Sequence, residues 1–353
     1  MMNRPTDRRL PAEWEPAEAI LIAWPHKNTD WAYMLDEVEQ CYTDIARAIT
    51  RFSRLIVVTP EPDHVGTILG DIPDDRITIL KIDTNDTWAR DFGAITTFET
   101  TADGKTEAVI NDFKFNGWGL KFASALDNLI TLRMTEAGIF SGNRRNRLGF
   151  VLEGGSVESD GRGLILTTSE CLLSPNRNGQ MDRNEIEEYL KDAFGAVKVL
   201  WLDHGALQGD DTDSHIDTLA RLAPDGDVIF YTGCADPDDE HYRTLKDMES
   251  QLKTFTTVDG KPFHLVELPL PDPIYDADEG IRLPATYANF LIVNGAVLLP
   301  VYGQPLKDRQ AMDTLRVAMP EYEIVPVDCR ALIRQHGSLH CITMQFPAGS
   351  TNI

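Results

Sequence analysis

Apolar positions along the 353-residue chain follow two periods that take turns. Apolar residues that recur every three or four positions predict amphipathic helices, whereas short apolar runs between turn residues predict strands. The helical period occupies five segments, at 34–51, 124–137, 183–194, 237–253 and 306–317. Each is followed by a strand-like run, at 54–58, 148–152, 197–202, 264–268 and 322–327. The fourth helix has a defined start, because Asp236 suits the N-cap and Pro237 suits the first helical position.

Four Asx-Gly pairs separate short β-type runs from one another. They are Asp103-Gly104, Asp160-Gly161, Asp225-Gly226 and Asn294-Gly295. Such pairs are the strongest local signal for a hairpin, because both residues tolerate the positive φ of a type I′ turn. They recur about 60 residues apart, which leaves enough chain for one supersecondary unit between them. The sequence therefore predicts one α/β domain over residues 1–353, built from about five modules of hairpin, helix and strand.

The composition is that of a globular protein in water, with 42% apolar and 25% charged residues. The formal net charge of −23 argues against nucleic acid or an anionic membrane surface as a partner. The same charge suits a small cationic substrate drawn to an acidic cleft, although it also serves solubility alone.

Neither a leader nor a membrane span is indicated by the sequence. Residues 1–9 lack the apolar core of a signal peptide, and the most apolar stretch, 290–302, is too short to span a bilayer. Five unevenly spaced cysteines fit a reducing compartment better than a disulfide framework. We therefore expect a cytoplasmic protein with no membrane partner, and leave assembly into homo-oligomers open.

Residues with candidate chemistry recur at equivalent places in the modules. Asp91, Glu153, Asp217 and Asn289 each fall just before or within the first strand of a hairpin, and Cys341 opens a comparable segment near the end of the chain. In a pseudo-symmetric ring of modules, equivalent strand positions face a common axis. These five groups can then converge on one central pocket.

Cys341, His215 and the aspartates supply the parts needed for nucleophilic attack on a cationic carbon. A thiolate is a strong nucleophile, an imidazole moves protons, and carboxylates hold a cation. The alternative for any single cysteine is a buried structural role, which we assign to the other four. If their segment is a strand, His215 and Asp217 share one face and point into the same space.

The acidic run 210–217 has two metal-binding alternatives. A calcium loop that starts at Asp211 fails, because Ile216 stands where glycine is needed and Leu222 where glutamate is needed. A transition-metal site from His215 and Asp217 stays open, but no second histidine cluster supports it.

Three further segments place aromatic or small residues beside polar ones. Trp88 and Arg90 stand close to Asp91, Trp118 lies between two glycines, and Glu153 precedes two more. Glycine lets the backbone approach a ligand closely. Each segment also suits an ordinary turn, and Arg90 with Asp91 suits an ordinary ion pair.

Taken together and in order, these segments resemble the agmatine deiminase and bacterial-type peptidylarginine deiminase family of the guanidine-modifying superfamily. The resemblance covers nearly the whole chain and rests on the following motifs: Pro11-Ala12-Glu13-Trp14-Glu15-Pro16, Ala23-Trp24-Pro25, Thr87-Trp88-Ala89-Arg90-Asp91, Asn116-Gly117-Trp118-Gly119, Glu153-Gly154-Gly155, Glu170-Cys171-Leu172-Leu173, Asn176-Arg177-Asn178, Asp211-Thr212-Asp213-Ser214-His215-Ile216-Asp217, Tyr287-Ala288-Asn289-Phe290 and His340-Cys341-Ile342-Thr343. Each motif alone is weak, but the ordered set is specific.

The resemblance implies a β/α propeller of five ββαβ modules around a central active site. It also implies that a guanidino group of a small cationic substrate is hydrolysed to a ureido group, with release of ammonia and without a metal or organic cofactor. The reaction would pass through a covalent thiouronium on Cys341. Asp91 and Asp217 would hold the guanidinium, and His215 would act first as an acid and then as a base.

The remaining site residues have less defined roles under this resemblance. Glu153 would orient His215 or hold the substrate, and Asn289 would support the cysteine loop or the substrate. The expected substrate contacts are Trp88, Arg90, Trp118, Asn289 and Asp211.

Departures from the family pattern concern the substrate tail. They are Gln335-His336-Gly337-Ser338-Leu339-His340 in place of a glycine-rich approach ending in Asn-Ile-His-Cys, Met344-Gln345-Phe346 in place of two glutamines, Thr218 in place of asparagine, and Ser156-Val157-Glu158 without a histidine often found there. Agmatine is the first expected substrate, with free arginine or peptidyl-arginine as the rival. Arg221 is placed in the sequence where it could bind an α-carboxylate tail. The alternative is a charge on the surface of a strand.

Alternatives to a deiminase stay open as well. A Cys-His-Asn acyl-transfer hydrolase would use Cys341, His215 and Asn289, and the two aspartates count against it. An amidinotransferase would share the covalent intermediate, and a catalytically silent binder would share only the fold.

Overall fold

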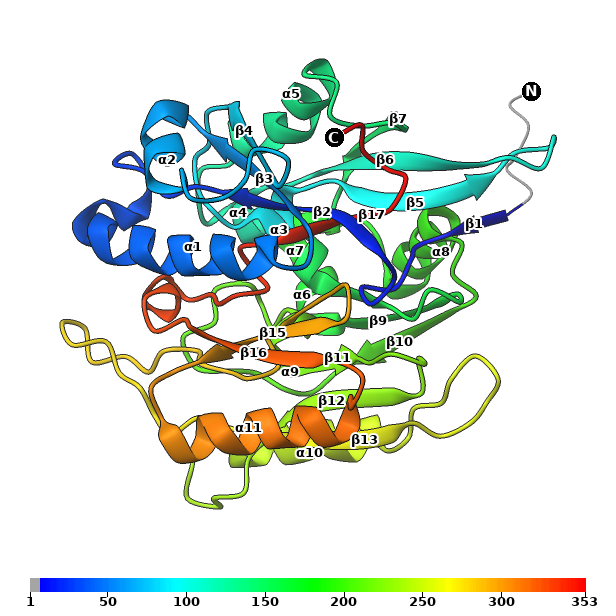
Figure 1. The fold of residues 1–353 in the computed structure, drawn as a ribbon. Helices are drawn as coiled ribbons and strands as arrows, with labels where there is room; N and C mark the ends of the chain where they lie inside the picture. The colour runs from blue at the N-terminus through cyan, green and yellow to red at the C-terminus, as the bar shows by residue number, and fades with distance from the viewer. Residues whose placement is uncertain (1–6) are drawn as a thin grey trace.

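The computed structural model describes residues 7–353, which form five small β-sheets in a mixed α/β arrangement with the long helices at the periphery (Figure 1). The expectation about a leader concerns residues 1–9, of which 1–6 lie outside the described residues. Among the described residues, no helix is both long and apolar enough to cross a membrane.

All five sheets share one connectivity, in which an antiparallel pair of strands is followed by a parallel neighbour. Three sheets consist of these three strands alone: β8 (Val157–Ser159), β9 (Leu164–Thr168) and β10 (Lys198–Leu202); β11 (Ala220–Leu222), β12 (Val228–Gly233) and β13 (His264–Pro269); β14 (Leu291–Val293), β15 (Ala296–Val301) and β16 (Glu323–Asp328). A parallel neighbour needs a crossover connection, which a helix packed beside the sheet provides.

The other two sheets carry one extra edge strand each. The first contains β1 (Asp7–Arg9), β5 (Ile95–Thr100), β6 (Thr106–Lys114) and β7 (Asn143–Val151). The second contains β17 (Met344–Pro347), β2 (Ala17–Ala23), β3 (Arg54–Thr59) and β4 (Ile77–Lys81). In this second sheet the C-terminal strand β17 pairs antiparallel with the N-terminal strand β2, so the two ends of the chain complete one sheet (Figure 1).

The four predicted hairpins are confirmed. The strand pairs β5–β6, β8–β9, β11–β12 and β14–β15 are antiparallel and are joined across the Asx-Gly positions. Both central residues have positive φ in two of the turns, at Asp225 (76°) and Gly226 (67°) and at Asn294 (42°) and Gly295 (83°). These are the angles that a type I′ turn requires.

Three of the five predicted helices agree closely with the structure. Helix α8 (Arg183–Phe194) has the predicted bounds, because Asp182 and Glu185 form a capping box at its start and Gly195 ends it with a φ of 68°. Helices α1 (Leu35–Thr50) and α11 (Pro305–Ala318) lie within one residue of their predicted ends.

Two predicted helices are shorter than expected. In 124–137 a 3₁₀ turn, η2 (Asp127–Leu129), precedes α5 (Ile130–Glu136). Helix α10 (Tyr242–Leu252) has His241 at its N-cap, so the prediction of Asp236 as the cap was wrong. Asp236 instead accepts a hydrogen bond from the N–H of Asp238 at 3.0 Å and holds a local turn. The other helical segments are η1 (Asp30–Met34), α2 (Pro62–Ile68), α3 (Ala89–Phe92), α4 (Gly117–Leu120), η3 (Gly154–Ser156), α6 (Ser169–Leu172), α7 (Pro175–Asn178), α9 (Ile216–Leu219) and η4 (Leu332–Gln335).

The short strands are deeply buried and supply much of the core. Residues 19–23 of β2 and 55–58 of β3 have no exposed surface. Such uninterrupted apolar runs are typical of strands covered on both faces. The burial of each large apolar side chain contributes about 1.5–3 kcal/mol, so the sheets form a rigid frame for the loops that precede them.

Candidate active site

The predicted catalytic residues lie in loops and short helical turns just before the first strand of each sheet's antiparallel pair. They are Asp91 in α3 before β5, Glu153 before β8, Asp217 in α9 before β11, Asn289 before β14 and Cys341 before β17. The structure brings these five side chains and His215 together in one buried cluster. Side chains from equivalent places before the five antiparallel strand pairs therefore lie close together.

His215 and Asp217 reach the cluster from a helical turn, so the prediction of a strand for this segment was wrong. His215 is the N-cap residue of α9, and Asp217 lies in its first turn. The hydroxyl of Thr212 accepts the N–H of His215 at 3.0 Å, and the hydroxyl of Thr218 donates to the carbonyl of His215 at 2.9 Å. Hydroxyl bonds of this local kind favour a turn over an extended strand.

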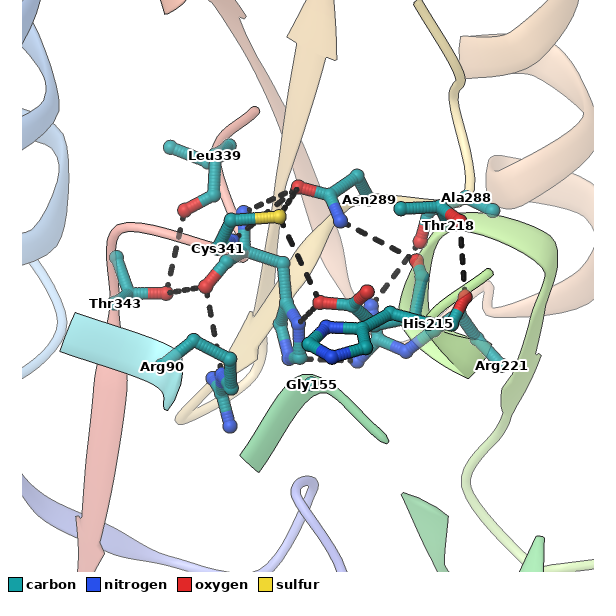
Figure 2. A network of polar contacts seen from close by, with 12 residues as sticks. Arg90, Gly155, His215, Thr218, Arg221, Ala288, Asn289, Leu339, Cys341 and Thr343 are labelled. Carbon is teal, nitrogen blue, oxygen red and sulfur yellow. Dashed lines mark hydrogen bonds and ion pairs between the residues drawn. The ribbon is translucent and has the colours of Figure 1, made fainter. Parts of the chain in front are cut away.

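The thiol of Cys341 is buried beside an amide and a carboxylate. Its sulfur lies 3.4 Å from Asn289 Oδ1 and 3.8 Å from Asp217 Oδ2. Asn289 Oδ1 also accepts the backbone N–H groups of His340 and Cys341, which fixes the cysteine loop (Figure 2). Burial, together with the charges of Asp217 and Asp91, raises the pKa of Cys341 well above its ordinary value. In the free protein the thiol therefore keeps its proton.

Two donors hold the carboxylate of Asp91 in place. Trp118 Nε1 donates to Oδ2 at 2.9 Å, and the N–H of Gly155 donates to Oδ1 at 3.0 Å. Burial raises the pKa of Asp91 to about 6. Glycine is needed at position 155, because a Cβ there would lie 2.7 Å from His215 Nδ1 and 2.9 Å from Asp91 Oδ1.

The ring of His215 lies between two carboxylates. Its Nδ1 is 3.7 Å from Asp91 Oδ1 and its Nε2 is 3.6 Å from Glu153 Oε2, and neither nitrogen has a hydrogen-bond partner among the described residues. Burial alone would lower the pKa of His215, but Asp91 and the other neighbours raise it well above 6.5. Glu153 is itself held by Arg177, whose Nε lies 3.0 and 2.8 Å from its two oxygens. His215 is therefore an imidazolium poised to release a proton.

Asp217 has one oxygen occupied and one free. Its Oδ2 accepts a hydrogen bond from His340 Nδ1 at 2.7 Å, whereas Oδ1 is buried and has no hydrogen-bond partner among the described residues. Burial alone would raise the pKa of Asp217, but the hydrogen bond from His340 outweighs burial and lowers it. An ionised carboxylate with a free oxygen beside a thiol is suited to accept hydrogen bonds from a cation.

A cavity of about 430 Å³, its open mouth included, leads to Cys341. Among the predicted substrate contacts, Trp88, Trp118 and Asp211 line it. Its acidic lining residues are Asp30, Asp86, Asp91 and Asp211. Among the described residues that form its wall there is no lysine or arginine. The cavity is therefore shaped by aromatic rings and carries excess negative charge.

Two predicted substrate contacts, Arg90 and Asn289, do not line this cavity. The side chain of Arg90 is buried on the far side of the cysteine segment, where Nε donates to the carbonyl of His340 at 3.4 Å and Nη2 lies 3.7 Å from Glu13 Oε2 (Figure 2). It lines a different cavity from the one that holds Cys341, and its contact with a substrate stays a prediction. Asn289 contacts the cysteine loop, which is the first of the two roles expected for it.

Arg221 is neither a surface charge nor part of the substrate cavity. It has no exposed side-chain surface, and its Nε donates to Glu158 Oε1 at 2.5 Å. Its Nη1 donates to the carbonyl of Ala288 at 3.1 Å, which braces the segment before Asn289. Its expected role toward an α-carboxylate tail is therefore corrected.

Sequence reasoning did not single out four residues around the predicted catalytic groups. Cys171 and Arg177 contact Glu153, His340 contacts Asp217, and Glu13 contacts His340. All four stand within the motifs quoted for the family resemblance, and that was the signal available in the sequence. Cys171 was assigned a structural role, yet its sulfur lies 3.7 Å from Glu153 Oε2.

Two groups of side chains in the described part of the chain place metal-binding atoms within 4.8 Å of one another. They are Glu153, Cys171 and His215, and Glu13, Glu158 and His340. In each group an arginine already neutralises the carboxylates, namely Arg177 in the first and Arg221 in the second. Both arrangements are thus explained by ion pairing within the protein.

Known proteins resemble this chain in sequence and fold over almost their whole length. The model of the Porphyromonas-type peptidyl-arginine deiminase family matches residues 9–347. A Pseudomonas aeruginosa agmatine deiminase is 32% identical over 364 residues, which cover 96% of this chain and 95% of that protein. A Porphyromonas gingivalis crystal structure, provisionally named an arginine deiminase, is 50% identical with a TM-score of 0.90 and covers 98% of this chain and 100% of its own. A structure of a C. jejuni agmatine deiminase with substrate bound is 37% identical with a TM-score of 0.87, and 96% of each chain is covered. The chain belongs to the Porphyromonas-type peptidyl-arginine deiminase family.

Proposed function

We propose that the protein is an agmatine deiminase, which hydrolyses agmatine to N-carbamoylputrescine and ammonia. The observation that carries the proposal is the position of the Cys341 thiol beside Asp217 at the end of an acidic cavity lined by aromatic rings. A planar cation fits such a site, because carboxylates bind guanidinium through paired hydrogen bonds and aromatic faces favour a cation.

In this proposal Asp91 and Asp217 hold the guanidinium. The free Oδ1 of Asp217 accepts one of its N–H groups, and Asp91 accepts another with lone pairs that Trp118 and Gly155 leave open. The bound cation offsets the negative charges that keep the Cys341 thiol protonated. The thiol then loses its proton to solvent and becomes a nucleophile.

The reaction proceeds in two stages. The thiolate forms a C–S bond with the guanidinium carbon, and a π-electron pair of that carbon moves to nitrogen. His215 gives its proton to the departing nitrogen, the C–N bond breaks, and ammonia leaves a thiouronium on Cys341. Neutral His215 next takes a proton from water, and a C–O bond forms. The hydroxyl of this adduct gives its remaining proton to solvent as the C–S bond breaks, and the ureido product leaves with the thiolate restored. Glu153, fixed by Arg177, holds the His215 ring for both proton transfers.

The charge of the cavity favours an amine tail. Asp30, Asp86 and Asp211 line the wall with Asp91, and each suits an ammonium group. An α-carboxylate would need an arginine, a lysine or backbone N–H groups. The nearby Lys121 is already bound to Asp213 Oδ1 at 2.7 Å, and His336 Nε2 lies 3.9 Å from Asp211 Oδ2.

A second candidate substrate is the arginine side chain, free or at a peptide end. It is favoured by the family description and by the arginine deiminase name of the 50% identical structure. Agmatine is preferred on the charge of the cavity, and agmatine deiminases are also among the relatives.

An acyl-transfer hydrolase is disfavoured by the contacts of Asn289. Its Oδ1 accepts the N–H groups of His340 and Cys341, which are the backbone donors nearest the sulfur along the chain. An oxyanion hole needs such donors to be free.

The same proposal extends to the architecture and location. The five sheets, each with an antiparallel pair and a parallel neighbour, support a propeller of five ββαβ modules in one catalytic domain over residues 1–353. Five free cysteines support a cytoplasmic location. No assembly into oligomers is assigned.

The test is a colorimetric assay of ureido product on the purified protein with agmatine, arginine and a peptide ending in arginine. Cys341→Ala is the blank. We expect turnover of agmatine with little product from the other two. Turnover of the arginine compounds alone would keep the chemistry and refute the amine-tail assignment, and product from none of the three would refute the proposed function.

A further inference from the structure

The N-terminal motif reaches the active site through His340, although the proposed reaction gives it no role. His340 Nδ1 is 2.7 Å from Asp217 Oδ2, and its Nε2 is 2.6 Å from Glu13 Oε2. All three side chains are buried. They form a continuous row of short polar contacts, and the row ends at the free Oδ1 of the carboxylate that lies beside Cys341.

Each ring nitrogen of His340 faces a carboxylate oxygen of a different residue, so the ring is held at both ends. Arg221 Nη2 also lies 3.2 Å from Nε2 and 3.0 Å from the same Glu13 oxygen, so the guanidinium and the ring meet at one carboxylate. Burial alone would raise the pKa of Glu13, but the charges of Arg221, His340 and Arg90 lower it instead.

We propose that Glu13 and His340 are positioning residues for the substrate-binding carboxylate of Asp217. Glu13 fixes the orientation of the ring, and the ring occupies Oδ2 of Asp217. Oδ1 is then the oxygen left to meet the guanidinium. The inference rests on the proposed function in one respect, namely that Asp217 binds the guanidinium of the substrate. It does not depend on whether the substrate tail is an amine or a carboxylate.

Two matched pairs of variants separate positioning from general stability. Glu13→Gln removes the charge that faces His340, whereas Glu158→Gln removes an equal charge from the same buried cluster but from a residue bonded to Arg221. His340→Asn places an amide near the position of Nδ1 and can still donate to Asp217. His340→Gln places its amide near the position of Nε2, toward Glu13, and leaves Asp217 without its donor.

The measurements are KM and kcat for agmatine, the melting temperature, and calorimetric binding of methylguanidine and agmatine in a Cys341→Ala background. We expect Glu13→Gln and His340→Gln to raise KM and weaken binding of both ligands about ten- to hundredfold, the worth of one charge-assisted hydrogen bond. Glu158→Gln stays near the wild-type values, and His340→Asn recovers most of the binding that His340→Gln loses. A purely structural role would lower kcat through loss of active sites and leave KM unchanged.

The proposal is overturned if Glu13→Gln weakens guanidine binding no more than Glu158→Gln does. It is equally overturned if folded His340→Gln keeps wild-type KM and binding. Should the His340 variants fail to fold, the comparison between the two glutamate variants decides. A wild-type protein that binds methylguanidine but does not turn over agmatine refutes the proposed function and leaves this binding test intact.

Discussion

Gly155→Ala should disable the site with a single methyl group. The backbone of Gly155 is outside the left-handed region, so alanine is allowed there without backbone strain. The new Cβ would lie 2.7 Å from His215 Nδ1, 2.9 Å from Asp91 Oδ1 and 3.1 Å from Asp217 Oδ2. One methyl group therefore pushes on the proposed acid and on both proposed substrate carboxylates.

The size of the effect follows from these distances. Ordinary contact begins at 3.4 Å, so the methyl group lies 0.7 Å too close to His215 and 0.5 Å too close to Asp91. Misplacement of reacting groups by about 1 Å costs about 100-fold in rate, and we expect kcat/KM to fall about 30- to 100-fold. Overpacking costs about 1–3 kcal/mol, which a typical domain tolerates without unfolding.

The assay is kcat/KM for agmatine alongside the melting temperature. Gly149→Ala in β7 is the matched control, because nothing lies within 4 Å of a Cβ placed at that position. The control should keep wild-type activity. If Gly155→Ala stays within about threefold of the control while folded, the described approach of His215, Asp91 and Asp217 to this backbone is refuted, since a shift of several tenths of an ångström should cost more.

Three further outcomes are expected. Asp91→Asn should lower kcat/KM for agmatine at least about a hundredfold, because it removes one of the two charges that hold the guanidinium, and full activity would exclude that role. Because burial raises the pKa of Asp91 to about 6, kcat/KM should fall as the pH drops below about 6, and this acid limb should be absent from whatever activity Asp91→Asn retains. Burial also raises the pKa of Asp127 to about 7. At pH 5 the folded protein therefore holds a proton on Asp127 that the unfolded chain has lost. Ionising this carboxyl in the folded protein costs stability, and that cost grows as the pH rises toward 8. Asp127→Asn removes the ionisable group but keeps an acceptor for the N–H of Asn85. In denaturant titrations it should therefore raise the unfolding free energy by about 2 kcal/mol more at pH 8 than at pH 5. Equal gains at both pH values would contradict the raised pKa of Asp127.

Local chemistry made much of the fold predictable. The hairpins around Asp225 and Asn294 depend on residues that tolerate positive φ, and α8 depends on the capping box of Asp182 with Glu185. Each signal acts within a few residues, so the sequence carries it directly. The same locality explains the failure at Asp236, where the side chain bonded a nearby N–H in a turn and the helix began later.

Long-range pairing could not be predicted in the same way. Strand β17 pairs with β2 across almost the whole chain, and no turn signal records such a partner. The ion pairs of the buried arginines could not be predicted from the sequence either. Arg177 and Arg221 resemble surface charges in the sequence, and only the fold shows that they pair with Glu153 and with Glu13 and Glu158.

The two sides of the Cys341 segment differ in charge balance. In the proposed reaction, this difference makes formation of the Cys341 thiolate depend on substrate binding. Behind the cysteine segment, Arg90 and Arg221 pair with the buried carboxylates of Glu13 and Glu158, so this side has its cations in the free protein. In front, the carboxylates of the cavity have no arginine or lysine among the described residues of its wall. In the proposed reaction the missing cation is the substrate itself. Burial and the charges of Asp217 and Asp91 raise the pKa of Cys341, so in this proposal the thiol stays unreactive until a guanidinium neutralises the two carboxylates. The nucleophile is then formed only when its target is in place, which protects a buried cysteine from other electrophiles.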